Sequence, residues 1–386
     1  MGINGLHKFL ESNTKGSASR GIKRIHYSAL QDKVVAIDIS IYLYQFASAI
    51  KSSTDNLTTK DGLITTHIQG IISKTLGMLK KKMKPVFVFD GKATNLKENT
   101  LCARKDSKVS AKNELKELKL KIEETDKDNI FELDKLNEER IKLLKKCVSV
   151  SHKQMQECKE IALLLGIPII ESVEEADPQC AWLVKNGLAY ATASEDMDIL
   201  TFGTNKLLRG LSAKDHLIEY DLSILLDDLG ISMDQFIDLC ILLGCDYTDT
   251  IVGIGPKKAY DMIKKYKSID EMIKQDKNFK NKKFVLPENF NYEGARNYFK
   301  NPPIKEIKQE ELKWTKPKYD ELSVLLKEKY EYSQESIDKM FSVLQGGYYS
   351  VICGLKTNNE FVKDRTKYIK SLKNNINFDS NSDSDS

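Results

Sequence analysis

Two apolar segments that each end in an aspartate constrain the fold of this chain most strongly. Residues 33–38 (KVVAID) and 85–90 (PVFVFD) have the composition of buried strands, and each carries its acid at the carboxyl end. A helix predicted from Thr65 to Leu79 lies between them, and this order is typical of a βαβ unit with parallel strands. Ligands of open α/β sheets bind at the carboxyl ends of the strands. We therefore expect an α/β fold, a central mostly parallel sheet flanked by helices, with Asp38 and Asp90 at its ligand-binding edge.

A third acidic segment follows the strand predicted from Leu188 to Ala193, in the sequence ATASEDMDILTFG of residues 191–203. Asp196 and Asp198 are two residues apart, so both side chains can turn toward one point. Carboxylates forced together repel and lose hydration, which proteins seldom accept without a cation, and hard oxygen ligands favour Mg²⁺ or Mn²⁺. One Asp-x-Asp alone is more often an ordinary acidic loop. Four acids at strand ends favour a metal site, and we expect Glu195 to face outward.

Two further acids, Glu175 and Asp177, stand just before the helix predicted from Pro178 to Lys185. Acids at a helix N-terminus also interact favourably with the helix dipole. That ordinary explanation accounts for one of them more easily than for both. We therefore include both among the candidate metal ligands.

The composition indicates a folded chain with a heavily charged surface, because 41% of the 386 residues are hydrophobic and 30% are charged. Residues 1–110 hold 18 Lys or Arg against 8 Asp or Glu. This excess fits an anionic polymer as partner, or a basic face that is simply solvated. No apolar segment has membrane-spanning length, no signal-peptide core is present, and the seven cysteines lack zinc spacing. We expect an intracellular protein that is neither secreted nor inserted in a membrane.

Residues 92–146 interrupt the alternation of strands and helices. The part from 111 to 146 lacks Pro and Gly and holds ten basic and ten acidic side chains. Its leucines do not keep heptad spacing, which argues against a coiled coil. We predict a helical arch that rises from the carboxyl edge of the sheet, above the acidic residues.

A second motif follows the buried helix predicted for residues 234–244. The segment from Gly253 to Ala259, GIGPKKA, predicts a helix–hairpin–helix over residues 234–266. The free backbone N–H groups of such a hairpin can hold a DNA phosphate without reading bases. Two glycines alone would also fit a simple turn, but the adjacent Lys257 and Lys258 favour DNA binding.

Other segments carry weaker signals. Ser12 to Arg24 is polar, basic and contains glycine, so we expect a loop there. Lys206–Arg209 and Leu217–Tyr220 predict two short strands that close the sheet. The final Asn/Ser/Asp-rich residues predict disorder.

These motifs together resemble those of the structure-specific 5′ nucleases, and most closely the eukaryotic and archaeal flap endonucleases. The matching segments, in order, are MGINGL, VVAIDIS, KPVFVFDGK, GIPIIES…EEADPQCA, ASEDMDILTFG, LCILLGCDY and IVGIGPKKA, with VPENF and ELKW further on. They extend from residue 1 to about residue 315. The resemblance implies a structure-specific 5′-flap endonuclease with 5′-3′ exonuclease activity, which hydrolyses DNA phosphodiester bonds in replication and repair.

The resemblance also implies roles for individual residues. It implies seven metal-binding carboxylates: Asp38, Asp90, Glu175, Asp177, Asp196, Asp198 and Asp246. The catalytic set it implies combines three of these with two arch-base cations that contact the scissile phosphate: Asp38, Asp90, Asp196, Lys97 and Arg104. The DNA contacts it implies are Gly2, Tyr44, Lys51, Thr65, Lys97, Arg104, Gly253, Gly255, Lys257 and Lys258. Among these, Tyr44 would stack on a base and Thr65 would contact a one-nucleotide 3′ flap.

The implied cofactors are two Mg²⁺ ions, replaceable by Mn²⁺, with K⁺ at the hairpin. Two such ions, roughly 3.5–4 Å apart, stabilise the attacking water and the leaving oxygen of an in-line displacement. The implied partner is branched or flapped double-stranded DNA, bound by a monomer. The implied location is an intracellular site of DNA replication, which is the nucleus in a cellular eukaryote.

Two departures from the family pattern limit what the resemblance implies. The family usually has a glutamate where Asp177 stands, and the shorter side chain can reach a metal through water. The family's sliding-clamp box is not evident either, because Gln345 is followed by GGYYSVI, which lacks the final aromatic pair. A sliding clamp therefore stays an open question as a partner.

We predict five regions: an N-terminal nuclease region (1–110), the arch (111–146), an internal nuclease region with the helix–hairpin–helix (147–270), a C-terminal helical extension (271–372) and a disordered tail (373–386). Two other functions remain open. The first is a 5′-3′ exonuclease of the same superfamily. The exonuclease branch has an acid–Ala–Asp pattern, and residues Glu175–Asp177 match it. The second is a catalytically silent DNA-structure-binding protein, against which the full carboxylate set argues.

Overall fold

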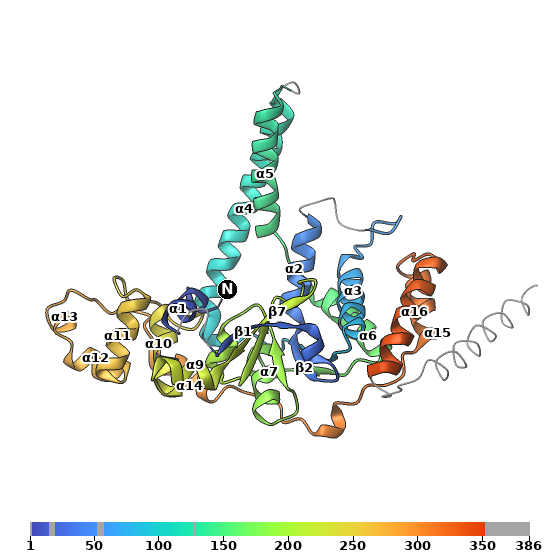
Figure 1. Cartoon of the computed structure of the whole chain (residues 1–386). Coiled ribbons are helices and arrows are strands. Elements are labelled where there is room, and N and C mark those ends of the chain that lie inside the picture. The colour runs from blue at the N-terminus through green and yellow to red at the C-terminus, as the bar shows by residue number, and fades with distance from the viewer. Residues whose placement is uncertain (1, 15–19, 52–57, 127–128, 352–386) are drawn as a thin grey trace, which may run out of the picture.

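A seven-stranded sheet organises the computed structural model, which describes residues 2–14, 20–51, 58–126 and 129–351 (Figure 1). The strands are β1 (Ile22–His26), β2 (Val34–Asp38), β3 (Lys84–Phe89), β4 (Ile169–Glu171), β5 (Ala191–Ala193), β6 (Lys206–Arg209) and β7 (His216–Asp221). Their order across the sheet is β1-β7-β6-β5-β2-β3-β4. The strands from β4 to β6 in this order are parallel, whereas β7 and β1 pair antiparallel. The predicted α/β class with a mostly parallel sheet is confirmed.

The central strands are covered on both faces. Along β2, Ala36 belongs to one hydrophobic core and Val35 and Ile37 belong to the other, because successive side chains of a strand point to opposite faces. Val88 and Phe89 of β3 divide between the two cores in the same way. A strand buried on both faces needs a continuous apolar segment, which is why β2 and β3 could be predicted from the sequence.

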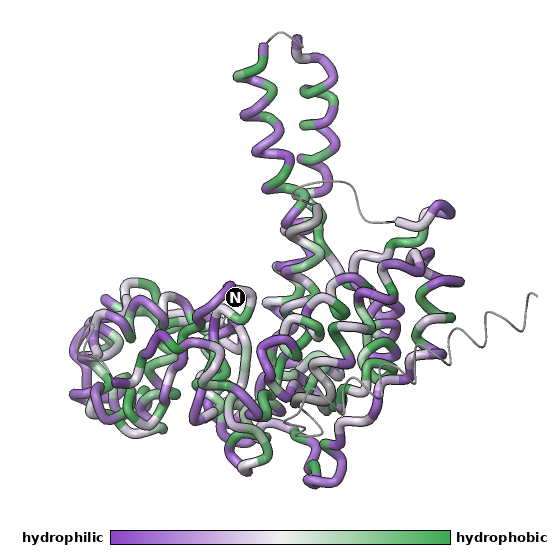
Figure 2. Tube along the Cα trace, turned by 45° about the vertical axis from the view of Figure 1, so that its right-hand side comes forward, coloured by the Kyte–Doolittle hydropathy of each residue, from purple (hydrophilic) through white to green (hydrophobic). Residues whose placement is uncertain are grey.

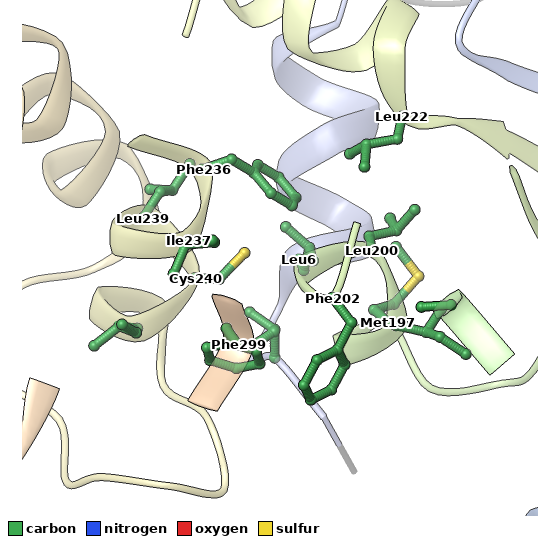
Figure 3. Packing of buried hydrophobic residues seen from close by; sticks show 14 of the residues in the cluster. Leu6, Met197, Leu200, Phe202, Leu222, Phe236, Ile237, Leu239, Cys240 and Phe299 are labelled. Atoms are coloured by element: carbon green, nitrogen blue, oxygen red, sulfur yellow. The ribbon is translucent and has the colours of Figure 1, made fainter. Parts of the chain in front are cut away.

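Helices from both ends of the chain cover these two faces. The first core contains residues of α1 (Leu6–Asn13), α7 (Ala176–Lys185), α8 (Asp198–Thr201), α9 (Leu222–Leu229) and α10 (Met233–Leu243). Figure 3 shows Leu6, Leu200 and Phe236 pointing toward one another in this core. The second core contains residues of α2 (Ile39–Lys51), α3 (Thr66–Lys80), α6 (His152–Leu164), α15 (Tyr319–Glu328) and α16 (Gln334–Val351). Among the residues described, none of the helices combines the length and apolar character needed to cross a bilayer.

One strand lies where the sequence predicts a loop. β1 pairs antiparallel with β7, from Ile22 opposite Tyr220 to His26 opposite His216. Its two isoleucines are only partly buried and the basic residues between them are exposed, so the segment lacks the apolar alternation of a typical strand. Exposed charge on an edge strand also discourages pairing with other chains. The loop predicted from Ser12 to Arg24 is therefore wrong for its last three residues, from Ile22 to Arg24, and residues 15–19 lie outside the described residues.

A helical hairpin projects from the body above the carboxyl edge of the sheet (Figure 1). It consists of α4 (Glu98–Glu124) and α5 (Ile130–Lys146), which meet through Ala111, Leu118, Leu143 and Cys147. Figure 2 shows hydrophilic and hydrophobic residues alternating along both helices. α4 begins before the predicted start at residue 111, because no Gly or Pro interrupts residues 98–111. A short 3₁₀ helix, η3 (Asn95–Lys97), leads into it.

The helix–hairpin–helix belongs to a lobe on the other side of the sheet from α15 and α16 (Figure 1). Its helices are α10 and α11 (Pro256–Tyr266), followed by α12 (Ile269–Gln275), α13 (Lys277–Lys280) and α14 (Tyr292–Lys300). Arg296 holds this lobe together, because its Nε lies 2.7 Å from Asp238 Oδ1 and its Nη2 lies 2.8 Å from Asp270 Oδ2. Since Asp238 is buried, the paired guanidinium fixes α14 against α10 and α12.

The C-terminal helices are packed parts of the body. Trp314 Nε1 donates to the Pro85 carbonyl oxygen at 2.9 Å, which fastens the chain beneath the sheet after the short helix η4 (Gln309–Glu311). Gln345, which precedes the segment GGYYSVI, lies within α16 and is 8% exposed. Residues 352–372 of the predicted extension and the predicted tail, residues 373–386, lie outside the described residues.

Candidate functional site

Three adjacent strands bring four aspartates to one edge of the sheet. Asp38 ends β2, Asp90 directly follows β3, and Asp196 and Asp198 follow β5. β2 pairs in parallel with β3 on one side and with β5 on the other. Their carboxyl ends therefore meet, and so do the acids that follow them.

Two helix ends add the other three carboxylates. Glu175 is the N-cap residue of α7 and Asp177 lies in its first turn. The backbone N–H of Ala176 donates to Asp90 Oδ1 at 2.9 Å, which joins the start of α7 to the end of β3. Asp246 comes just after α10 and completes the acidic cluster, by which we mean these seven carboxylates.

Burial and like charge raise the pKa of Asp38. Burial is the largest cause, and the charges of Asp90 and Asp196 act in the same direction. The backbone N–H groups of Ser40 and Ile41 oppose this shift by donating to Asp38 Oδ1 at 3.1 and 3.4 Å. The start of α2 therefore stabilises the carboxylate only in part.

Asp177 and Asp198 have the clearest need for a cation. Burial raises the pKa of Asp177, and the charges of Asp38 and Asp196 raise it further. Burial also raises the pKa of Asp198, with Asp196 as the next cause. The Oδ1 atom of each residue is buried without a hydrogen-bond partner. Carboxylate oxygens in this situation favour the protonated form unless a cation is supplied.

Two cationic side chains at the base of the arch offset part of this charge. Lys97 places its Nζ 2.7 Å from Glu175 Oε1 and 3.5 Å from Asp246 Oδ2. Arg104 of α4 places its Nη2 2.6 Å from Asp246 Oδ2. Burial disfavours the charge on Lys97, but Glu175 and then Asp246 raise its pKa, so the amine is a stable ammonium ion. Seven carboxylates thus share two side-chain cations.

The start of the chain lies directly against this cluster. Gly2 has a φ of +82°, and a Cβ atom added there would lie 1.7 Å from Asp196 Oδ1 and 2.6 Å from Asp198 Oδ1. The backbone N–H of Asn4 donates to the Gly244 carbonyl oxygen at 3.1 Å, beside the loop that carries Asp246. Position 2 therefore has room for glycine alone.

Glu195 differs from its prediction. Its Oε1 accepts a hydrogen bond from the Gly210 N–H at 2.9 Å, and its Oε2 lies 3.8 Å from Arg209 Nε. Its side chain is 25% exposed, so the predicted outward orientation is wrong. Successive side chains point in opposite directions at the end of β5, so Glu195 turns away from Asp196. The Glu195 carboxylate thereby links the loop after β5 to the turn after β6.

Three of the predicted DNA contacts lie on α2 and at the start of α3. Tyr44 is 40% exposed, as a residue that stacks on a base requires. Thr65 is the N-cap residue of α3 and is 8% exposed. Lys51 ends α2, and its side chain lies outside the described part of the chain.

The other predicted contacts form the hairpin between α10 and α11. Gly253 has a φ of +87° and packs against Phe284, and Gly255 is the N-cap residue of α11. Lys258 donates to the Gly253 carbonyl oxygen at 2.7 Å and lies 4.9 Å from the centre of the Phe284 ring. Lys258 thus braces the hairpin, whereas Lys257 is exposed and free to meet a phosphate.

Sequence reasoning missed one member of the site. The Tyr247 hydroxyl donates to Glu175 Oε2 at 2.5 Å, and its ring lies 4.9 Å from Lys97 Nζ. The available signal was its place directly after Asp246 in the segment LCILLGCDY.

The donor chemistry of the cluster fits a hard divalent cation. Within the described ranges, no three His, Cys, Asp or Glu side chains are close enough together to hold a metal as they stand. The groups are nevertheless all carboxylates, several are buried beside like charge, and two oxygens lack partners. Mg²⁺ and Mn²⁺ prefer such oxygen ligands. The Lys97 ammonium serves as a cation within this cluster.

A parallel sheet with acids at one edge, a helical arch beside them and a helix–hairpin–helix defines a structure-specific 5′ nuclease. The sequence matches family models described as the XPG N-terminal domain over residues 1–111 and the XPG I-region over residues 166–246. It is 40% identical to Flap endonuclease 1 of Nematostella vectensis over 342 residues, which are 87% of this chain and 85% of that protein. It is 38% identical to Flap endonuclease 1 of Naegleria gruberi over 343 residues, or 87% and 84% of the two proteins. The chain belongs to the flap endonuclease family.

Solved structures agree with this assignment. The flap endonuclease-1 from Methanococcus jannaschii is 26% identical and has a TM-score of 0.63, with 86% of this chain and 97% of that chain covered. The catalytic core of Rad2 in complex with a DNA substrate is 22% identical with a TM-score of 0.66, and covers 89% of this chain and 100% of its own. At this level of identity, the comparison with Rad2 shows only that the two proteins share a fold. The predicted family and fold are confirmed.

Replacing Gly2 by alanine is expected to slow flap cleavage about a hundredfold, because the added Cβ must displace Asp196 and Asp198, and a displacement of about 1 Å can have an effect of this size. The rate is measured in single-turnover reactions on 5′-labelled flap DNA. Gly5→Ala is the matched control, since Gly5 also has a positive φ, +67°, but nothing lies within 4 Å of its added Cβ. Equal rates for the two variants would contradict this placement of the N-terminus.

Proposed function

We propose that this flap endonuclease is a Mg²⁺-dependent enzyme that cuts 5′ flaps from branched DNA, with 5′-3′ exonuclease activity, in replication and repair. The observation that carries the proposal is the convergence of seven carboxylates beside Lys97 and Arg104. Burial and mutual repulsion raise the pKa of Asp38, Asp177 and Asp198 in this cluster. Such an arrangement is stable as a set of ions only with added positive charge.

Two Mg²⁺ ions, replaceable by Mn²⁺, are the cations that suit this site. The residues that would hold them are Asp38, Asp90, Glu175, Asp177, Asp196, Asp198 and Asp246. Asp177 and Asp198 each offer a buried oxygen without a partner. When bound, ions of this kind lower the pKa of water and offset charge on the phosphate during an in-line displacement.

Lys97 and Arg104 act on the phosphate. Both now pair with carboxylates, Lys97 with Glu175 at 2.7 Å and Arg104 with Asp246 at 2.6 Å. A scissile phosphate at the edge of the cluster can take over these two donors. Preorganised cations placed where negative charge develops stabilise the transition state. Because a duplex phosphate must leave its stack to reach them, unpairing of the DNA end contributes to substrate selection.

DNA beyond the cleavage site is held by backbone contacts. The hairpin at Gly253 and Gly255 presents free N–H groups at the start of α11, next to the exposed Lys257, and suits a phosphate with K⁺ as an added cation. Tyr44 offers an exposed ring to an unpaired base. We propose a monomer that acts at intracellular sites of DNA replication, the nucleus in a cellular eukaryote. If a sliding clamp binds, it contacts a surface other than one built on Gln345.

One feature favours the exonuclease as a second candidate. Asp177 stands where flap endonucleases usually have glutamate, and the sequence Glu175-Ala176-Asp177 reproduces the pattern of the exonuclease branch. A 5′-labelled double-flap substrate and a nicked duplex separate the two activities. Release of the intact flap supports the endonuclease, release of mononucleotides supports the exonuclease, and binding without cleavage in Mg²⁺ identifies a silent DNA-binding protein.

Asp196→Ala is expected to bind flap DNA normally but to cleave it at least several hundred times more slowly, since it removes a carboxylate from the centre of a metal-activated site. Fluorescence anisotropy gives the binding, and quenched-flow cleavage in Mg²⁺ gives the rate. Glu195→Gln is the matched control, because its side chain keeps an oxygen for the Gly210 N–H and does not join the cluster. Cleavage by Asp196→Ala at a near-normal rate would refute the assignment.

A further inference from the structure

A cavity of about 440 Å³ lies behind α2, apart from the acidic cluster. It is bounded by α2, α3, the 3₁₀ helix η2 (Tyr27–Leu30) and the turn between β6 and β7. Its walls are mostly apolar side chains, such as Leu43, Phe46 and Met78. Gly70 and Gly77 of α3 also line it; Phe46 packs closely against Gly70, whereas nothing lies within 4 Å of a Cβ added at Gly77. Its volume is that of a site for a small organic molecule.

Lys74 of α3 and Lys81, the C-cap residue of that helix, both line this cavity, and within the described residues neither forms an ion pair with a carboxylate. Lys74 Nζ lies 3.6 Å from the centre of the Tyr42 ring and 3.3 Å from Ser212 Oγ. Lys81 Nζ lies 3.3 Å from the centre of the Tyr27 ring and donates to the Ala213 carbonyl oxygen at 3.0 Å. Within the part of the chain that the structure describes, neither ammonium group has an acidic oxygen within 4.0 Å.

Burial makes the charged form of both lysines unfavourable when no ligand is bound. Burial lowers the pKa of Lys74 to about 7, and burial also lowers the pKa of Lys81. Buried charges are ordinarily paired. The hydroxyl of Tyr42, whose ring lines the same cavity, is buried without a hydrogen-bond partner in the described structure. Two lysines and a free hydroxyl donor therefore border this cavity, and the charges of Glu195 and Asp215 act on Lys74 and Lys81 only from beyond ion-pair distance.

We propose that this cavity binds a phosphate ester, with the phosphate between Lys74 and Lys81 and the organic part against the apolar walls. Contacts with both lysines and with the Tyr42 hydroxyl complete the pairing that these groups lack. The same chemistry is offered by a free nucleoside monophosphate and by a phosphate of a DNA strand. This site is independent of the acidic cluster, so it does not depend on the proposed catalytic function.

The test compares Lys74→Met/Lys81→Met with wild type and with Lys80→Met, an exposed lysine on the same helix. In EDTA, isothermal titration calorimetry with thymidine 5′-monophosphate measures the free-nucleotide arm. Flap DNA binding at several salt concentrations measures the DNA arm, where loss of two phosphate contacts lowers the salt-dependence slope by about 2. If the double variant does not fold, Lys81→Met alone is used, with a slope change of about 1.

If Lys74→Met/Lys81→Met loses nucleotide binding while wild type and Lys80→Met keep it, the site is assigned to a free nucleotide. If neither wild type nor the double variant binds the nucleotide, and the variant has the lower salt-dependence slope for flap DNA, the site is assigned to a DNA strand. If the variant matches Lys80→Met in both arms, the proposal is wrong.

We also infer that Tyr247 is a positioning residue for two parts of the acidic site, an inference that rests on the proposed function. Its hydroxyl donates to Glu175 Oε2 at 2.5 Å, while Lys97 Nζ lies 2.7 Å from Glu175 Oε1. The Tyr247 ring also lies 4.9 Å from Lys97 Nζ, within cation–π range. One side chain therefore fixes both a candidate metal ligand and the ammonium group that meets the phosphate.

The ring can do this because it is itself held rigidly. Tyr247 is 4% exposed and packs in a cluster of aromatic rings. The ring centres of Tyr298 and Phe299 lie 4.8 and 5.0 Å from its own. Without the hydroxyl, Glu175 loses a donor on the side away from Lys97 and is free to turn further toward the ammonium group.

Tyr247→Phe keeps the ring packing and removes only the hydroxyl. Compared with wild type, it is expected to weaken Mn²⁺ binding and lower kcat, each by about tenfold to a hundredfold, as loss of a partner of a metal ligand does. The KM for flap DNA should stay within about twofold, because remote DNA contacts are unchanged. Mn²⁺ binding is measured by electron paramagnetic resonance, and the control is Tyr298→Phe in the same aromatic cluster.

Mn²⁺ affinity and kcat equal to those of Tyr298→Phe would overturn the role of Tyr247. The proposed function has its own separate tests, which are cleavage of flap DNA by wild type in Mg²⁺ and the loss of that cleavage in Asp196→Ala.

Discussion

Repulsion among neighbouring carboxylates, of which Asp38 and Asp198 are buried, is the interaction on which the rest of this site depends. The parallel order β3-β2-β5 brings the acids at three strand ends to one edge of the sheet, and the start of α7 adds two more. Removing each charge from water is unfavourable, and the neighbouring charges make it more so. Gly2, Lys97 and Arg104 are arranged around this charge: the glycine leaves space beside two of the carboxylates, and the cations offset part of the excess.

The two cations connect the arch to the catalytic edge. Lys97 ends η3 and Arg104 lies in α4, so their contacts with Glu175 and Asp246 join the base of the arch to α7 and to the loop after α10. Under the proposed function, a divalent cation competes with them for the carboxylates, and a phosphate competes for the cations. Because a ligand shifts a conformational equilibrium toward the state it binds better, that proposal links occupancy of the site to the position of the arch.

The sequence was sufficient for features that depend on local pattern. The apolar segments ending in Asp38 and Asp90 predicted parallel strands, and parallel strands predicted where their acids would gather. Features decided by contacts between distant segments were missed or misplaced. Gly210 and Arg209 determine the orientation of Glu195, and pairing with β7 makes a strand of Ile22–His26. The hydrogen bond from Tyr247 to Glu175 gives that tyrosine its role. Tyr247 had a signal only in its place directly after Asp246, and the contacts of Glu195 and of Ile22–His26 have no signature at the residues concerned.

Thermal unfolding of wild type and Asp198→Asn, in EDTA and in Mg²⁺, measures whether the carboxylate cluster destabilises the fold until cations bind. Asn removes one buried charge whose pKa burial and Asp196 raise. Asp198→Asn is expected to have the higher unfolding midpoint in EDTA. Mg²⁺ is expected to raise the midpoint of wild type far more than that of the variant, since a ligand that binds only the native state stabilises it. A wild-type midpoint that Mg²⁺ leaves unchanged, together with a less stable Asp198→Asn in EDTA, would contradict both expectations.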